Sequence, residues 1–135
     1  MSEVVRIFLG RGDGDQVDAL ANLREAEGWL VASNANDLSV QEKITQVSGK
    51  RVEIQGAKAG LCVRIVAQNA LDAGAKEVAV DLKNVFWMGD EDADDESVMA
   101  VKARALGMIK HWDGYPKHKD KLTVTPEKVW NRFAD

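Results

Sequence analysis

Apolar and polar positions follow two different periods along this chain of 135 residues. Short apolar, β-branched runs are typical of strands, and segments with apolar positions every three or four residues are typical of amphipathic helices. The pattern predicts strands over residues 4–9, 29–32, 51–55 and 77–82, followed by an apolar run over 84–88. It predicts helices over residues 16–27, 39–48, 58–73 and 95–112, and a short final helix that begins at Pro126. Ser39 and Glu42 have the spacing of a capping box, so Ser39 is expected to cap the second helix.

The middle of the chain carries the clearest unit. Residues 51–55 alternate as a half-buried strand does, the helix over 58–73 has a face of small apolar side chains, and 77–82 alternates again. A strand, helix and strand with short connections form a right-handed parallel crossover. We therefore predict a single α/β domain over residues 1–135, with a four- to five-stranded, mostly parallel or mixed sheet, flanking helices and a short C-terminal helix.

Composition and charge exclude several classes of protein. The formal net charge is −4, whereas nucleic-acid binders usually carry a basic face, so we do not expect nucleic acid as a partner. No apolar run approaches the roughly 20 residues of a membrane-spanning helix. Cys62 is the only cysteine and the first residues lack the pattern of a signal peptide, so we expect a cytoplasmic protein. Cys62 falls on the small apolar helix face, where a packing role is expected.

A loop rich in glycine and aspartate directly follows the first predicted strand. Ligands of open α/β sheets gather at the carboxyl ends of strands, which makes Gly10–Asp15 a well-placed candidate site. The spacing matches neither a dinucleotide fingerprint nor a phosphate-binding P-loop. Two interpretations remain: Asp13 and Asp15 hold Mg²⁺, or the segment is a turn in which Asp15 caps the next helix. We favour the turn.

An acidic run, Asp90–Glu96, places six carboxylates in seven positions. Their mutual repulsion predicts an extended, solvated loop that leads into the positive end of the next helix. Two functional alternatives are a metal site that includes Asp90 and Asp94, and an acidic surface for a basic partner. We favour the solvated loop.

The segment Val85–Asp90, followed by Asp94, resembles the last acidic motif of haloacid-dehalogenase-like phosphatases, and the likeness continues through residue 108. That resemblance implies a Mg²⁺-dependent phosphohydrolase. Asp13 would attack the phosphoryl group, Asp15 would shuttle the proton, and Asp90 would hold the metal. Three residues, Gly10–Gly12, separate Asp13 from the strand that it would have to follow directly.

Aromatic residues gather late in the chain, where six of the eight fall: Phe86, Trp87, Trp112, Tyr115, Trp130 and Phe133. Tryptophan and tyrosine are favoured at binding hot spots and are also ordinary core material. We expect Trp112 in the core, because it ends an apolar seam of the helix predicted over 95–112 that also contains Val98, Val101, Ala105 and Met108. The predicted interaction residues are Trp87, Tyr115, Trp130 and Phe133. The final helix either docks on its own domain or reaches a neighbouring molecule in a homo-oligomer.

The only concentrated basic segment, residues 110–121, carries both histidines, and we expect a solvated polar loop over residues 113–121. His111 and His118 are not spaced as zinc ligands usually are. Because no complete catalytic set can be assembled, we predict a small accessory or protein-interaction protein. It would act without catalysis or cofactor, through the acidic loop and the late aromatic residues. The alternative is the Mg²⁺-dependent phosphohydrolase.

Overall fold

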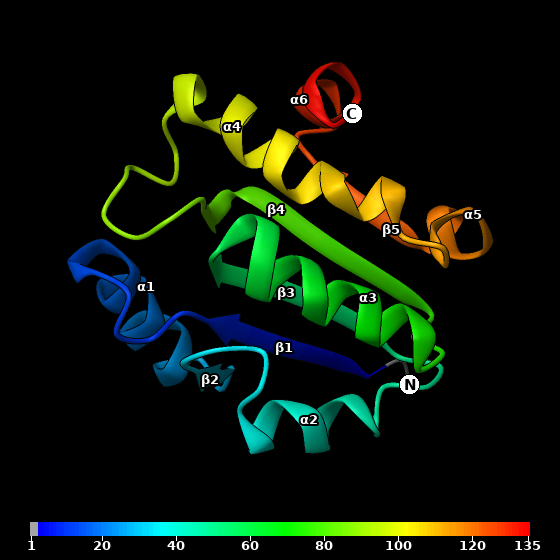
Figure 1. Ribbon diagram of the computed structural model, residues 1–135. Helices are drawn as coiled ribbons and strands as arrows, with labels where there is room; N and C mark the ends of the chain where they lie inside the picture. The colour runs from blue at the N-terminus through cyan, green and yellow to red at the C-terminus, as the bar shows by residue number, and fades with distance from the viewer. Residues whose placement is uncertain (1–2) are drawn as a thin grey trace.

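A computed structural model describes residues 3–135 of the chain. All strands of its sheet run parallel, in the order β2-β1-β3-β4-β5 (Figure 1). The strands are β1 (Val4–Leu9), β2 (Leu30–Ala32), β3 (Arg51–Ala57), β4 (Glu77–Phe86) and β5 (Leu122–Thr125). The chain passes from β1 outward to β2 and then returns to β3 on the other side of β1. The winding direction therefore reverses between β1 and β3, where doubly wound sheets have their topological switch point.

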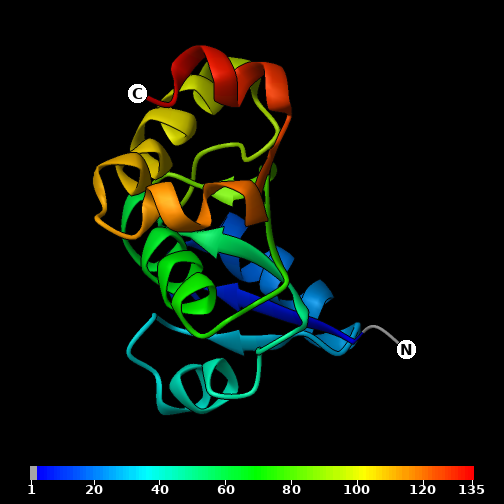
Figure 2. The same ribbon diagram turned by 90° about the vertical axis from the view of Figure 1, so that its right-hand side faces the viewer.

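Helices cover the two faces of the sheet unequally. The α-helices are α1 (Asp15–Ala26), α2 (Leu38–Ile44), α3 (Arg64–Asp72), α4 (Glu96–Leu106), α5 (Tyr115–His118) and α6 (Glu127–Phe133). Three tighter or wider turns complete the helical part: η1 (Ala59–Val63, π), η2 (Gly107–His111, 3₁₀) and η3 (Lys119–Lys121, 3₁₀). The helices α2, α3 and α4 lie on one face, and α1 lies on the other (Figure 2).

The alternation of side chains along the strands explains this arrangement. Val52 and Ile54 of β3 belong to the large core beneath α2, α3 and α4. On the opposite face, Phe8 and Phe86 form a smaller cluster with Val17 of α1. Parallel sheets normally have both faces covered, and here α1 packs on β2, β1 and β3 and covers only part of this face. The rest of the face stays open.

Charged residues keep the open face compatible with water. Glu53 pairs with Arg6 at 3.0 Å and with Arg51 at 3.1 Å, and Arg51 also pairs with Glu77 of β4. On the edge strand, the hydroxyl of Thr123 donates to Glu77 at 3.3 Å. These bonds run across the strands from β1 to β5.

The structure confirms the predicted α/β class and corrects several elements. The apolar run over 84–88 is not separate, because β4 continues to Phe86. The segment 113–121 is not a plain loop but contains α5 and η3, and β5 follows it as an edge strand. The α-helix expected over 95–112 stops at Leu106, where the chain tightens into η2. Ala134 packs closely on Gly107: a Cβ atom added to Gly107 would lie 2.9 Å from the Cα atom of Ala134.

The helix starts also differ from expectation. Asp37, rather than Ser39, caps α2, because its carboxylate accepts the Ser39 amide at 2.9 Å. Asp15 is the first residue of α1 and not its cap. Pro126 occupies the cap position of α6 and not its first turn.

The face of α4 is also corrected. The predicted apolar seam ran through Val98, Val101, Ala105, Met108 and Trp112. The residues of α4 that are buried instead are Met99, Lys102, Ala103 and Leu106. Every predicted position is half-buried or exposed.

None of the helices described over residues 3–135 is long and apolar enough to cross a membrane.

Candidate functional site

The loops after β1 and β4 meet at the carboxyl edge of the sheet, and they bring together two of the segments singled out from the sequence. A Cβ on Gly89 would overlap the carbonyl oxygen of Asp13. The Gln16 amide donates to Asp90 Oδ1 at 3.2 Å, and Gln16 Nε2 donates to the Asp90 carbonyl at 2.7 Å. The carboxylate of Asp90 thus sits at the N-terminal end of α1, where the helix dipole favours an anion. Asp90 joins the two loops.

The other predicted metal ligands point to solvent. Asp13, Asp15 and Asp94 are exposed. Within residues 3–135, no group of three or more His, Cys, Asp or Glu side chains is arranged to hold a metal ion.

Other carboxylates of the acidic run shape the turn that leads into α4. Asp92 accepts the Asp94 amide at 3.0 Å, and Asp95 accepts the Ser97 amide at 2.7 Å. Hydrogen bonds from the Ser97 side chain and backbone lower the pKa of the Asp95 carboxyl. Asp92 thus fixes the turn, and Asp95 caps the helix that follows it.

Lys102 of α4 is completely buried beneath this loop. Its ammonium donates to the carbonyl of Ala93 and, at 3.4 Å, to that of Leu82, and it lies 5.9 Å from the centre of the Phe86 ring. Burial lowers the pKa of Lys102 to about 8, although the nearby carboxylates of the loop, Glu91 foremost, oppose that shift. Lys102 thus ties the acidic loop to the body of the domain.

Sequence reasoning missed Lys102. The available signal was its spacing of three from Met99 and of four from Leu106, which places a lysine within an apolar stripe.

The predicted aromatic residues do not form one surface. Trp130 is only 8% exposed and packs in the core, with Lys110 Nζ 5.0 Å from its ring centre. Phe133 is half-buried, with the guanidinium groups of Arg104 and Arg132 each 5.1 Å from its ring centre. Both side chains hold α6 on its own domain. Tyr115 is half-buried as well.

Trp87 lies apart from these residues, at the carboxyl edge of the sheet. It belongs to a group of four exposed apolar side chains that line one shallow hollow, here called the carboxyl-edge patch: Leu61, Trp87, Met88 and Met108. They are 53%, 45%, 48% and 54% exposed, respectively. The other large apolar side chains exposed within residues 3–135 are Leu23 and Leu38, on α1 and α2. Scattered apolar side chains are normal on a surface, whereas contiguous ones mark an interaction site.

Three segments that are distant in sequence build the patch. Gly60 allows η1 to pack directly on α4, since a Cβ at that position would lie 3.1 Å from the Ala105 carbonyl oxygen. This close approach places Leu61 of η1 beside Met108, which follows α4. The third segment leaves the end of β4, where the Met88 amide donates to the Glu91 carboxylate at 2.9 Å. Lys58 and Arg64 line the same hollow.

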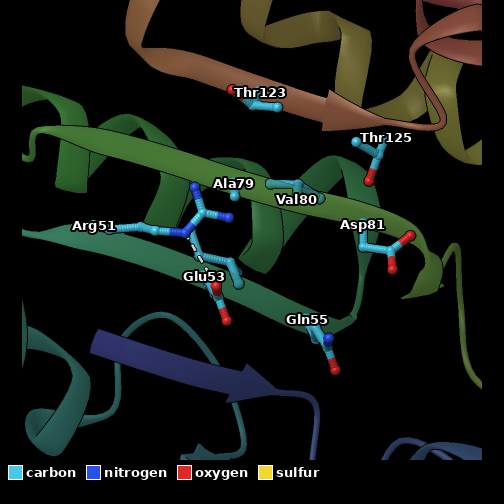
Figure 3. A pocket seen from close by; sticks show the side chains of 9 residues that line it. Arg51, Glu53, Gln55, Ala79, Val80, Asp81, Thr123 and Thr125 are labelled. Atoms are coloured by element: carbon cyan, nitrogen blue, oxygen red, sulfur yellow. Dashed lines mark hydrogen bonds and ion pairs between the residues drawn. The ribbon is translucent and has the colours of Figure 1, made fainter. Parts of the chain in front are cut away.

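A second hollow lies on the open face of the sheet (Figure 3). Six of the residues that line it are polar, namely Arg51, Glu53, Gln55, Asp81, Thr123 and Thr125. The others are Ile54, Ala79 and Val80. The polar groups bond mainly to one another or to neighbours. Arg24 Nε donates to Gln55 at 2.8 Å, and Asp81 accepts the Lys83 amide at 3.0 Å. This hollow therefore has little free capacity for a ligand.

The remaining reactive side chains have structural surroundings. Cys62 is half-buried and packs against the large core. His118 is buried, with Nε2 3.4 Å from Asp72 Oδ1 and its ring stacked on Trp112. His111 is exposed on η2. The two histidines thus differ in burial, and His118 fixes α5 against the domain.

Comparison with known protein families, with curated proteins and with solved structures finds no match to this chain. The side chains at the surface of the domain are therefore the guide to its function.

Proposed function

We propose that this protein works without catalysis, by binding a partner protein through the carboxyl-edge patch. The observation that carries this proposal is the convergence of four exposed apolar side chains on one hollow. Complete burial of a large apolar side chain contributes roughly 1.5–3 kcal/mol. Because each of the four is already about half-buried, a partner would recover about half of that free energy from each.

The composition of the patch favours a protein surface. Tryptophan is enriched among the residues that carry most of the binding energy at interfaces. Methionine is flexible and polarisable, so Met88 and Met108 can adapt to the shape of a partner. The location agrees with the general rule that doubly wound sheets bind their ligands beyond the carboxyl ends of the strands.

The surroundings disfavour a phosphorylated substrate. Asp90 already occupies the N-terminal end of α1, where a phosphate group would otherwise find amide donors. The neighbouring carboxylates of residues 91–96 would repel a substrate anion. These features support a protein partner over a phosphoryl-transfer reaction.

Location and excluded partners follow from the same proposal. We propose a cytoplasmic protein, because its lone Cys62 suits a reducing compartment. Its net charge of −4 argues against nucleic acid as the partner.

Paired alanine variants test the proposal. Trp87→Ala removes the largest side chain of the patch, and Leu38→Ala removes a side chain on α2 that is 68% exposed and lies outside it. Proteins captured from lysates of the producing cells by the wild type are identified, purified and titrated against both variants. Binding should weaken at least about tenfold for Trp87→Ala and stay unchanged for Leu38→Ala. The partners tested include another copy of the chain. If the wild type and both variants bind every partner equally well, the proposed function is wrong.

A further inference from the structure

We propose that the occupant of the carboxyl-edge patch is a second copy of this chain, related to the first by a twofold axis that passes through the patch. This inference rests on the proposed function and names the partner. A twofold interface brings the same surface of each copy together, so the surface must be complementary to itself. The apolar centre of the patch meets that condition, because Leu61, Trp87, Met88 and Met108 would cover their counterparts.

Charges around the patch meet the same condition. Lys58 and Arg64 flank Leu61 on the side of η1 and α3 and line the hollow. On the side of the loop after β4, Glu91 bonds the Met88 amide, and Asp92 follows it in an exposed position. We place the twofold axis in the interface and between these two sides, because a rotation about that axis exchanges them. The cations of one copy then face the carboxylates of the other.

Three of these four groups already make hydrogen bonds inside the chain: Arg64 donates to Gly60 and Gln68, Glu91 accepts the Met88 amide, and Asp92 accepts the Asp94 amide. In the part of the chain that the structure describes, ion pairs involve other residues and none of Lys58, Arg64, Glu91 and Asp92. Elsewhere the chain pairs its charges, as on the open face of the sheet. An apolar centre flanked by charges of both signs that form no ion pair within the chain is the arrangement expected of a self-complementary interface.

The overall charge does not oppose this pairing. Two copies of net charge −4 repel one another at long range. At physiological ionic strength, charges more than about 8 Å apart on exposed surfaces are largely screened. The local contacts across the twofold axis therefore outweigh the repulsion between distant charges.

Sedimentation velocity over a range of protein concentrations tests the inference directly. The mass should rise from 14.8 kDa towards twice that value as concentration increases. Trp87→Ala should shift the midpoint to at least about tenfold higher concentration, and Leu38→Ala should leave it unchanged. Circular dichroism of each variant checks that the fold is retained.

A charge exchange tests the orientation of the two copies. Lys58→Glu alone and Asp92→Lys alone should each weaken the dimer, because like charges then face each other at both symmetric contacts. An equimolar mixture of the two variants should recover it, since both contacts in the mixed dimer join opposite charges. Lys76→Glu, an exposed position at the other end of the sheet, is the matched control and should have no effect.

The outcomes separate the inference from the proposed function. A wild type that stays at the monomer mass at all concentrations, while Trp87→Ala still loses binding to another purified protein, would overturn the second-copy inference alone. Absence of any effect of Trp87→Ala, on self-association and on every captured protein, would overturn both. A concentration-dependent dimer that the mixed charge variants fail to restore would overturn the twofold arrangement.

Discussion

The buried ammonium of Lys102 donates a hydrogen bond to the backbone carbonyl of Ala93, nine residues earlier in the chain. Through this bond, α4 holds the acidic loop that begins at the carboxyl-edge patch. Trp87 and Met88 start that loop, so the shape of the patch depends on a side chain that never reaches the surface.

Replacing Lys102 by methionine should release the loop while keeping the fold. Methionine fills similar space and removes the cost of burying a charge. The Ala93 carbonyl loses its donor and can turn to water. Hydrogen exchange should therefore quicken at the amides of residues 90–95 and not in β1 or β3. Lys76→Met, at an exposed position, is the control; unchanged exchange in the loop of Lys102→Met would show that Lys102 does not hold it.

The pH dependence of stability should carry the signature of the same lysine. Its pKa is about 8 in the folded protein, against about 10.4 for an unperturbed lysine. Between these values the unfolded chain binds more protons than the folded chain, so the contribution of Lys102 to the free energy of unfolding rises with pH. Below about pH 8 both states are protonated, and the full cost of burying the charge remains.

Urea unfolding at pH 7.5, 8.5 and 9.5 measures this effect as the difference between the wild type and Lys102→Met. The difference should shift in favour of the wild type as pH rises through this window. Taking the difference cancels the contributions of other titrating groups to the pH dependence. One such group is Tyr115, whose pKa is raised by burial and by the nearby Asp120. A difference that is constant over the range would mean that Lys102 titrates normally in the folded protein.

Gly56 should be among the least replaceable residues of the sheet. It has φ 105°, and a Cβ there would overlap the carbonyl oxygen of Leu9 on the neighbouring strand. Gly28 has φ 92° with open space around it, so a substitution there carries the cost of the left-handed backbone without the cost of a steric clash. Gly28→Ala should lose about 1–2 kcal/mol from the left-handed backbone alone. Gly56→Ala should lose at least about 2 kcal/mol more, because β1 and β3 must move apart.

Chemical denaturation compares the two glycine variants under the same conditions. Equal losses of unfolding free energy would mean that β1 and β3 are not packed as closely at Gly56 as the structure indicates.

Asp90 should act as an anchor for α1 and not as a metal ligand. Asp90→Ala removes the carboxylate that accepts the Gln16 amide, at a cost of about 1 kcal/mol. Asp90→Asn, which keeps an acceptor, should cost less. The melting temperature of the wild type should be the same in EDTA and in millimolar Mg²⁺. A rise on the order of 10 °C, lost in Asp90→Asn, would instead reveal a filled metal site.

Local pattern was sufficient for much of the architecture. The unit from Arg51 to Leu82 was predictable because its strands alternate, its helix has a small apolar face, and short parallel connections have one handedness. The edge strand β5 was harder, because four residues with two threonines exposed resemble a loop until β4 supplies their hydrogen-bond partners.

The face of α4 could not be predicted from its own residues. Apolar residues lie on both of its possible seams, and periodicity alone does not choose between Val101 and Lys102. The choice depends on β4, η1 and α6, which contact the helix from several sides. The sheet thus leaves Met108 at the surface and buries a lysine.

By itself, the sequence determined the α/β class, the parallel central unit and the presence of a charged loop after the fourth strand, because these follow from contacts between residues close in the chain. Only the tertiary structure decided which chemistry the surface carries. Leu61, Trp87 and Met108 belong to three segments that meet only when η1 packs on α4. Asp90 became a helix anchor because the loop after β4 folds onto the loop after β1. The physical reason is that both sites are made of long-range contacts, which the periodicity of neighbouring residues does not encode.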